Sequence, residues 1–497
     1  MLIVCGILFL IYAWRVTRDT HPMTEFVSAN RQAEIFAPDL LAQRAKIAAF
    51  RGWDTLPEDH PWRLASAALN RQWDYPDWYL RNLVGRRTYI SGNDAGSFSN
   101  AVVVTRMTSV GALLERLRRW LPGTEVDRAG GLNLRVLPDD GLYYAIRGRV
   151  LLLSPSRRAL IQALTLAPEE RANARDIDNA FSTLGAADLA GRFRLEPEQR
   201  WGAWLDTVSF ALHIDEAATL VRYTAELRHG SEGAIQQLLN NARPVPLPAT
   251  LPGAASIVVD FGAPVDALWP ALGDVFKTPI FSDQRWQQWR SGEEGSIGPP
   301  LTSLAANAGP AVRVAWRGVS LTDLLPAPQI LLTATAPEHV FSEWASQLSP
   351  PPDPADTSWR APAPYFERES NTVVLPWRAG SDLTPAVSVA PSGILAVSSR
   401  AHLPEALNLP EDQTKPVTGN VHGRVNPAHL LEDIAQLGAA WAEAGMLEVE
   451  SAEAFDQNLA TWRERMRDIQ QVTVTAACDR GLVQGDIRIE HAAAQAK

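Results

Sequence analysis

The stretch VLLLSPSRRALIQALTL at Val150–Leu166 recurs later in the chain as GILAVSSRAHLPEALNL at Gly393–Leu409. In the ungapped pairing seven positions are identical, where unrelated segments would share about one or two. The identical pairs are Leu152/Leu395, Ser156/Ser399, Arg157/Arg400, Leu160/Leu403, Ala163/Ala406, Leu164/Leu407 and Leu166/Leu409. This repeat predicts that one structural module occurs twice.

Other segments recur around this repeat in the same order. They are a strand with the helix after it (101–121 and 330–348), a Gly-Arg strand (189–195 and 421–425) and a hairpin that reaches an Asp (207–227 and 471–490). The repeat itself predicts a hairpin and then a helix, with Ser156 and Ser399 placed to cap the two helices. We therefore expect an α+β fold of two tandem related lobes, each a mostly antiparallel sheet with packed helices, behind an N-terminal transmembrane helix.

The repeat also sets the expected domain boundaries. The length of 497 residues suits two or three domains of ordinary size. We expect a membrane anchor at 1–18, a helical, aromatic-rich lead-in at 19–96, lobe 1 at 97–241, a Pro-rich joint at 242–253, lobe 2 at 254–490 and a tail at 491–497. Lobe 2 has additional segments near 283–310 and 348–364.

The N-terminal stretch MLIVCGILFLIYAW, Met1–Trp14, has no charged side chain. Extended to Val16 it would form roughly 24 Å of helix, against a hydrocarbon core of about 30 Å. No cleavage pattern follows it, so we expect an uncleaved anchor rather than a signal peptide or a buried helix. Arg15 and Arg18 favour a cytoplasmic body, whereas the Trp-rich, Lys-poor body favours the periplasm. We expect a single-pass protein of the bacterial inner membrane with a periplasmic body.

Charge and cysteine content exclude several classes of protein. The net charge of -10 and the absence of a basic stretch argue against nucleic-acid binding, which needs clustered cations. The two cysteines, Cys5 and Cys478, allow neither a disulfide framework within the body nor a cysteine-based zinc site.

Large aromatic side chains are concentrated between Trp53 and Val84. They are Trp53, Trp62, Trp73, Tyr75, Trp78 and Tyr79. Trp and Tyr dominate the binding energy of protein interfaces, so these residues are candidates for partner binding. The alternative is that the rings form the core of a small helical cap, since Trp is highly buried on average.

Motifs of the common enzyme classes are absent. The sequence contains no P-loop, no Gly-x-Gly-x-x-Gly, no His-Glu-x-x-His and no Gly-x-Ser-x-Gly. We therefore predict no catalytic residue, no cofactor-binding residue and no cofactor. His422, His429 and Asp433, with His402 upstream, come nearest to a metal site, but their spacing gives no coordination geometry and we predict no metal.

Arg157 and Arg400 are the polar residues that the repeat shares. A cation in the first turn of a helix is slightly unfavourable to the helix dipole. We expect both guanidinium groups to hold a carboxylate or a neighbouring strand. Anion binding is the alternative.

An apolar N-terminus before two lobes of strand–helix and hairpin–helix units, without a catalytic motif, resembles bacterial membrane-anchored proteins grouped as domains of unknown function. The resemblance covers roughly Ser97–Glu490, is architectural, and implies no functional residue. We expect a membrane-tethered, non-enzymatic scaffold or binding protein of the bacterial envelope that engages a protein partner. The alternative is a small-ligand binder, or an enzyme with a dispersed site, in the cleft between the lobes.

Overall fold

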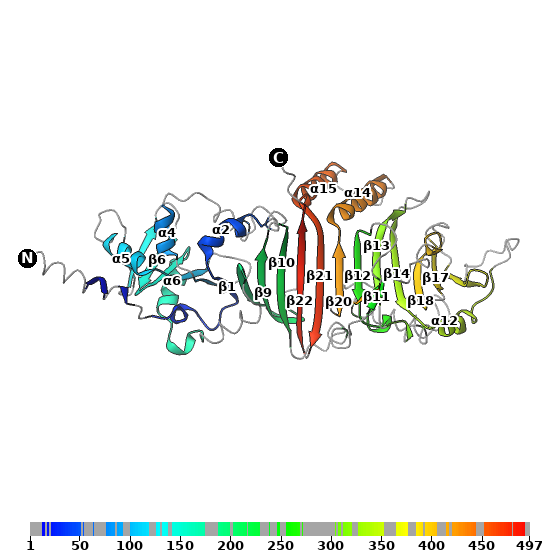
Figure 1. Cartoon of the computed structure of the whole chain (residues 1–497), viewed down its shortest axis with the longest axis horizontal. Coiled ribbons are helices and arrows are strands. Elements are labelled where there is room, and N and C mark those ends of the chain that lie inside the picture. The colour runs from blue at the N-terminus through cyan, green and yellow to red at the C-terminus, as the bar shows by residue number, and fades with distance from the viewer. Residues whose placement is uncertain are drawn as a thin grey trace, which may run out of the picture. The chain divides into compact units, whose positions relative to one another are not determined.

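The computed structural model of the chain divides into two compact units, Met1–Glu226 (unit 1) and Leu227–Lys497 (unit 2) (Figure 1). The structure describes residues 12–14, 17–18, 21–50, 53, 63, 76–84, 87–92, 100–118, 126–129, 132–137, 142–173, 187–198, 202–215, 217–228, 238, 246–248, 255–268, 271, 304, 307–309, 312–320, 327–351, 364–375, 384–390, 393–404, 414–416, 420–443, 452–479 and 481–492. Within these residues, 22 strands and seven α-helices are defined.

The sheet of unit 1 has ten described strands in the order β4-β5-β6-β7-β3-β2-β1-β8-β9-β10. Their bounds are β1 Ala33–Ala37, β2 Thr88–Gly92, β3 Val102–Arg106, β4 Val126–Ala129, β5 Leu132–Leu137, β6 Leu142–Arg147, β7 Val150–Ser154, β8 Leu189–Arg194, β9 Leu205–Ile214 and β10 Ala218–Leu227. The β6–β7 hairpin turns at Gly148, whose φ of 57° is adopted most readily by glycine.

The sheet of unit 2 has ten described strands in the order β15-β16-β17-β18-β14-β13-β12-β20-β21-β22. Their bounds are β12 Ile257–Phe261, β13 Val312–Ser320, β14 Ala327–Thr335, β15 Tyr365–Glu367, β16 Thr372–Val374, β17 Pro385–Val389, β18 Ile394–Ser399, β20 Val421–Val425, β21 Ile469–Asp479 and β22 Leu482–His491. A separate pair joins β11 (Pro246–Pro248) to β19 (Thr414–Pro416).

The two sheets have one strand order. Taken along the chain, β12 to β18 of unit 2 occupy the places of β1 to β7 of unit 1, and β20 to β22 occupy those of β8 to β10. In unit 1 the central strand β1 lies between β2 and β8. In unit 2 the central strand β12 lies between β13 and β20. A duplicated module would give this agreement.

Helices cover both faces of the unit 1 sheet. Helix α5 (Ser109–Arg118) contributes Ala112 to a core cluster that contains Leu151. Helix α6 (Arg157–Leu164) packs in a different cluster with Leu152. Successive residues of a strand point to opposite faces, so α5 and α6 lie on opposite faces of this sheet.

Unit 2 is covered in a corresponding way. Helix α12 (Glu338–Ala345) follows β14 as α5 follows β3, and its Phe341 packs with Leu395. On the other face Leu403 packs with Ala396. Unit 2 also has two long helices between β20 and β21. They are α14 (Pro427–Glu443), which packs against β13, β14 and β21, and α15 (Ala452–Met466), which packs against α14.

The residue in β18 that corresponds to Leu152 is Ala396, not Leu395. Leu152 shares its cluster with α6, whereas Leu395 lies on the opposite face with α12. Strand β18 has six residues and β7 has five, so an ungapped pairing cannot match both ends. A slip of one residue moves every side chain to the other face of a sheet. The repeat is therefore one residue out of register in this strand.

The α+β class expected behind a transmembrane helix is wrong. Antiparallel strands dominate the described chain, and all strand pairs with a defined register are antiparallel. The segment expected as a helical lead-in supplies the strands β1 and β2 at the centre of the unit 1 sheet. Strand β1 has only five residues, AEIFA, which is too short for a periodic pattern to separate strand from helix.

The expected membrane anchor is also corrected. No helix among the described residues is long and apolar enough to cross a membrane. Of Met1–Trp14 only residues 12–14 are described, and residues 1–11 lie outside the described part of the chain. The prediction of a single-pass inner-membrane protein with a signal anchor is therefore wrong. It depended on the apolar composition of a segment that is shorter than the hydrocarbon core of a membrane.

The expected lobe, joint and tail boundaries stay predictions. Only 246–248 of the joint are described. The additional segments near 283–310 and 348–364 lie mostly outside the described residues, apart from 304, 307–309, 348–351 and 364.

Candidate functional site

The aromatic residues expected to bind a partner do not form one group. Trp62, Trp73 and Tyr75 lie outside the described residues, whereas Trp53, Trp78 and Tyr79 are described. The indole Nε1 of Trp53 donates a hydrogen bond to the carbonyl oxygen of Ile47 at 2.6 Å, and its ring lies edge-on to Phe50 with centroids 5.1 Å apart. Trp53 therefore stabilises the end of helix α2 (Leu40–Ala48).

Tyr79 fixes helix α4 (Asp77–Leu83) to α5. Its hydroxyl donates a hydrogen bond to Glu115, which is only 3% exposed, and it also accepts one from Arg118 at 3.3 Å. Burial, together with the hydrogen bond to Glu115, raises the pKa of Tyr79 to about 12. The phenol therefore stays neutral and acts as an anchor.

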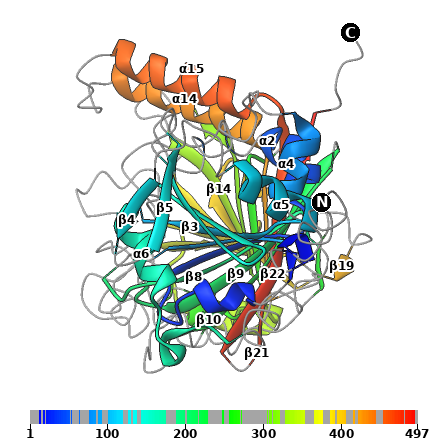
Figure 2. The ribbon, with the colours of Figure 1, turned by 90° about the vertical axis from the view of Figure 1, so that its left-hand side faces the viewer.

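Trp78, the neighbour of Tyr79, is 57% exposed. Its helix is held firmly: the backbone N–H of Thr108 donates to the carbonyl of Asn82 at 3.0 Å, and the side chain of Asn82 donates to the carbonyl of Trp78 at 2.7 Å. A Cβ atom on Gly111 would lie 2.0 Å from the Asn82 carbonyl oxygen, so only glycine allows α4 and α5 to approach this closely (Figure 2). An exposed indole is thus presented on a fixed helix.

The two arginines of the repeat have different surroundings. Arg157 is the first residue of α6 and is exposed. Arg400 follows β18, and its Nη2 lies 2.6 Å from Oε1 of Glu367 in β15. Anion binding at either residue stays a prediction.

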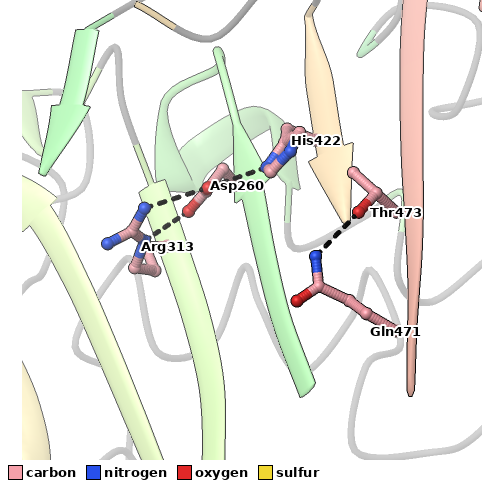
Figure 3. A network of polar contacts seen from close by, with 5 residues as sticks. All are labelled: Asp260, Arg313, His422, Gln471 and Thr473. Atoms are coloured by element: carbon pink, nitrogen blue, oxygen red, sulfur yellow. Dashed lines mark hydrogen bonds and ion pairs between the residues drawn. The ribbon is translucent and has the colours of Figure 1, made fainter. Parts of the chain in front are cut away.

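A buried ion pair with a histidine lies at the centre of the unit 2 sheet, at a place where no local sequence pattern predicts a site (Figure 3). Asp260 of β12 is directly opposite Arg313 of β13 on one side and His422 of β20 on the other. Arg313 donates through Nε and through Nη2, the latter at 3.0 Å from Oδ2 of Asp260. Asp260 and Arg313 are 2% and 5% exposed, whereas the His422 side chain is 30% exposed.

These contacts keep Asp260 ionised. Burial alone would raise its pKa, but hydrogen bonds from His422 and Arg313 outweigh that effect and hold the pKa of Asp260 below its usual value. The Nδ1 atom of His422 lies 3.4 Å from Oδ2 of Asp260. When Nδ1 donates to the carboxylate, Nε2 becomes the acceptor of the neutral ring. Asp260 therefore orients the imidazole.

Two polar residues that could act with His422 are engaged elsewhere. Thr475 lies opposite His422, and its hydroxyl accepts a hydrogen bond from the backbone N–H of Asp486 at 3.1 Å. The carboxylate of Asp433 accepts a hydrogen bond from the hydroxyl of Ser256. Among the described residues, no group of three or more His, Cys, Asp or Glu side chains is placed to hold one metal ion.

Single charges in apolar strands were the signal for this network. Asp260 lies in IVVDF and Arg313 in VRVAW. A buried charge requires a partner, so either strand predicts that an opposite charge lies on a neighbouring strand. The partners of Asp260 are 53 and 162 residues away in the sequence. A local sequence pattern therefore cannot identify them.

Comparison with known proteins gives little. No family model matches the chain, and no curated protein sequence matches it. Crystal forms III, IV and I of TP0453 match with 9%, 10% and 10% identity and TM-scores of 0.25, 0.23 and 0.26. These matches cover 46%, 43% and 46% of this chain and 89%, 83% and 89% of the other chains. At such TM-scores the likeness identifies neither fold nor function.

Proposed function

We propose that this protein is a non-enzymatic binding protein that engages a protein partner through helix α4, with Trp78 as the central contact. The observation that carries the proposal is that Trp78 is 57% exposed while the next residue in the same helix, Tyr79, is hydrogen-bonded to the buried Glu115. Trp is the residue most enriched among interface hot spots. A fixed helix also loses little conformational entropy when a partner binds.

The surroundings of Trp78 fit a partner-binding surface. On α5, Val110 precedes Gly111, the residue at the α4–α5 contact, and its side chain is 53% exposed. Asp77 is exposed and pairs with Arg44 at 3.2 Å, which supplies charge beside the indole. An apolar centre with charged residues at its edge is the usual composition of a protein interface. A small-ligand binder or an enzyme with a dispersed site stays the alternative.

The test is a pull-down with the full chain from cells that express it naturally, followed by a binding measurement with the purified partner. Trp78→Ala is compared with Trp462→Ala, which removes an indole of 42% exposure from α15 in unit 2. We expect Trp78→Ala to weaken the partner about 30-fold or more, which corresponds to the roughly 2 kcal/mol that defines a hot spot. Trp462→Ala should leave the affinity unchanged.

Two results would contradict the proposal. One is that Trp78→Ala binds the partner as tightly as the wild type does. The other is that Trp462→Ala weakens binding equally, which would show that any exposed indole has the same effect. Circular dichroism of each variant shows whether the fold is kept.

A further inference from the structure

Three hydrogen-bond donors lie side by side on one face of the unit 2 sheet. Thr473 of β21 is directly opposite Arg424 of β20 and directly opposite Arg488 of β22. Residues that oppose each other across antiparallel strands share a face of the sheet. Neighbouring strands are about 4.8 Å apart, so an arginine lies on the strand to each side of Thr473.

All three side chains have donors to spare. Thr473 accepts a hydrogen bond from Nε2 of Gln471 at 3.1 Å (Figure 3), which leaves its own proton available. The Nε of Arg488 bonds Glu490 at 3.1 Å, and its side chain is 60% exposed, so its Nη groups remain available. Arg424 is half-buried, and within the described part of the chain its guanidinium has neither an ion pair nor a hydrogen bond.

No carboxylate of the described residues forms an ion pair with Arg424. Asp260 is held by Arg313, and Glu490 is held by Arg488. A half-buried guanidinium without a counter-charge favours an anion from solution.

Unit 1 supplies a contrast at the corresponding position. Arg192 follows Gly191 in β8 as Arg424 follows Gly423 in β20. Arg192 lies opposite Glu34 of β1, an acidic residue, whereas Arg424 lies opposite Val258 of β12. Glu34 is engaged by Arg31, so at this register the sheet of unit 1 has a carboxylate held by another arginine, where the sheet of unit 2 has an apolar residue.

We propose that Arg424, Thr473 and Arg488 bind an oxyanion group, a carboxylate or a phosphate, of a small ligand. Guanidinium groups match the two oxygens of such a group with paired N–H donors. The hydroxyl of Thr473 supplies a third donor between them. This site is in unit 2 and is independent of the partner surface on α4.

The experiment is isothermal titration calorimetry of the full chain with inorganic phosphate and, separately, with succinate, at constant ionic strength. The proposal expects saturable binding of at least one anion, and the preferred anion identifies the source of the oxyanion group. Arg424→Gln should weaken this binding about tenfold or more, as expected for loss of a charge-assisted contact. Thr473→Val, which keeps the side-chain shape, should also weaken it, and Arg192→Gln should not.

The proposal is overturned if neither anion binds the wild type saturably, or if Arg424→Gln binds as the wild type does. It is also overturned if Arg192→Gln weakens binding as much as Arg424→Gln, since the effect would then be one of net charge. Circular dichroism verifies that each variant is folded. If Arg424→Gln does not fold, Thr473→Val decides, and unchanged binding by that variant overturns the proposal.

Discussion

Unit 1 and unit 2 build one strand order around different central contacts. Gly191 of β8 lies opposite Ile35 of β1, and Gly423 of β20 lies opposite Val259 of β12, so these positions correspond. The adjacent row differs completely. It consists of Phe36, Tyr89 and Ala190 in unit 1 and of Asp260, Arg313 and His422 in unit 2.

The difference indicates that the strand order does not depend on the chemistry of the central row. Both rows are packed within a sheet whose faces are covered by apolar clusters. The central row is free to be aromatic in one unit and ionic in the other, and only the ionic one gains an oriented imidazole.

Arg313→Met should give the largest effect on stability. It leaves Asp260 charged and buried without its guanidinium partner, and breaking a buried pair in this way costs about 3–5 kcal/mol. Hydrogen exchange followed by mass spectrometry should show lost protection in β12 and β13 but not in β1 and β2. Equal loss in both units would contradict the independence of the two central rows.

The double variant Asp260→Phe with Arg313→Tyr is the control for Arg313→Met. It gives unit 2 the aromatic residues that unit 1 has in Phe36 and Tyr89. A buried ion pair is often replaced by apolar residues at little or no cost. Protection of β12 and β13 should therefore recover most of the way, and failure to recover would show that the two rows are not interchangeable.

Acid should lower the stability of unit 2, because it protonates Asp260. Its pKa is lower in the folded protein than in the unfolded chain, so its contribution to stability is present above the unfolded value of about 4 and is lost as the pH falls through the folded value. Protection of β12 and β13 should decline below about pH 4. The Asp260→Phe, Arg313→Tyr variant should lack this component, and an identical pH profile would disprove the assignment to Asp260.

Tyr79→Phe tests the anchor of unit 1. The variant removes the hydroxyl that hydrogen-bonds Glu115 and leaves a buried carboxylate with fewer partners, a loss of about 1–3 kcal/mol. Protection of α4 and α5 should fall while that of α14 and α15 stays unchanged. No change in α4 would show that the hydroxyl does not fix this helix.

The smallest expected effects come from the two serines of the repeat. The side chain of Ser156 accepts a hydrogen bond from the backbone N–H of Ala159 at 3.2 Å and caps α6. The hydroxyl of Ser399 is buried and has no hydrogen-bond partner among the described residues. Ser156→Ala should cost about 1 kcal/mol, and Ser399→Ala should cost nothing measurable by urea denaturation. Equal losses in the free energy of unfolding would indicate that the two serines have the same role, as the ungapped pairing of the repeat predicts.

Several strands of unit 1 could be located from the sequence. The run AVVVTR at 101–106 corresponds to β3, and the hairpin expected at 143–154 corresponds to β6 and β7. These segments are continuous apolar or alternating runs with a clear turn, here at Gly148. Local pattern is enough for such elements.

The central strands and the ionic row could not be located in the same way. Strands β1 and β12 have five residues each, and Glu34 and Asp260 interrupt their apolar pattern. Glu34 pairs with Arg31, three residues away. The partners of Asp260 come from strands that are 53 and 162 residues away, and only the sheet register reveals them. The one-residue slip between Leu152 and Leu395 has the same origin, because identity of letters does not fix which face a side chain occupies.

Disulfide cross-linking of paired strand positions tests most directly whether the two units share one register. Cys5 and Cys478 are first replaced by Ser. Val104 with Leu152, and Thr333 with Ala396, are then changed to Cys pairwise, since each pair is directly opposite across its strands and opposed Cβ atoms lie within disulfide reach. We expect both pairs to form disulfides under mild oxidation, while Cys at Thr333 and Leu395 does not. Cross-linking at Leu395 instead of Ala396 would contradict the register.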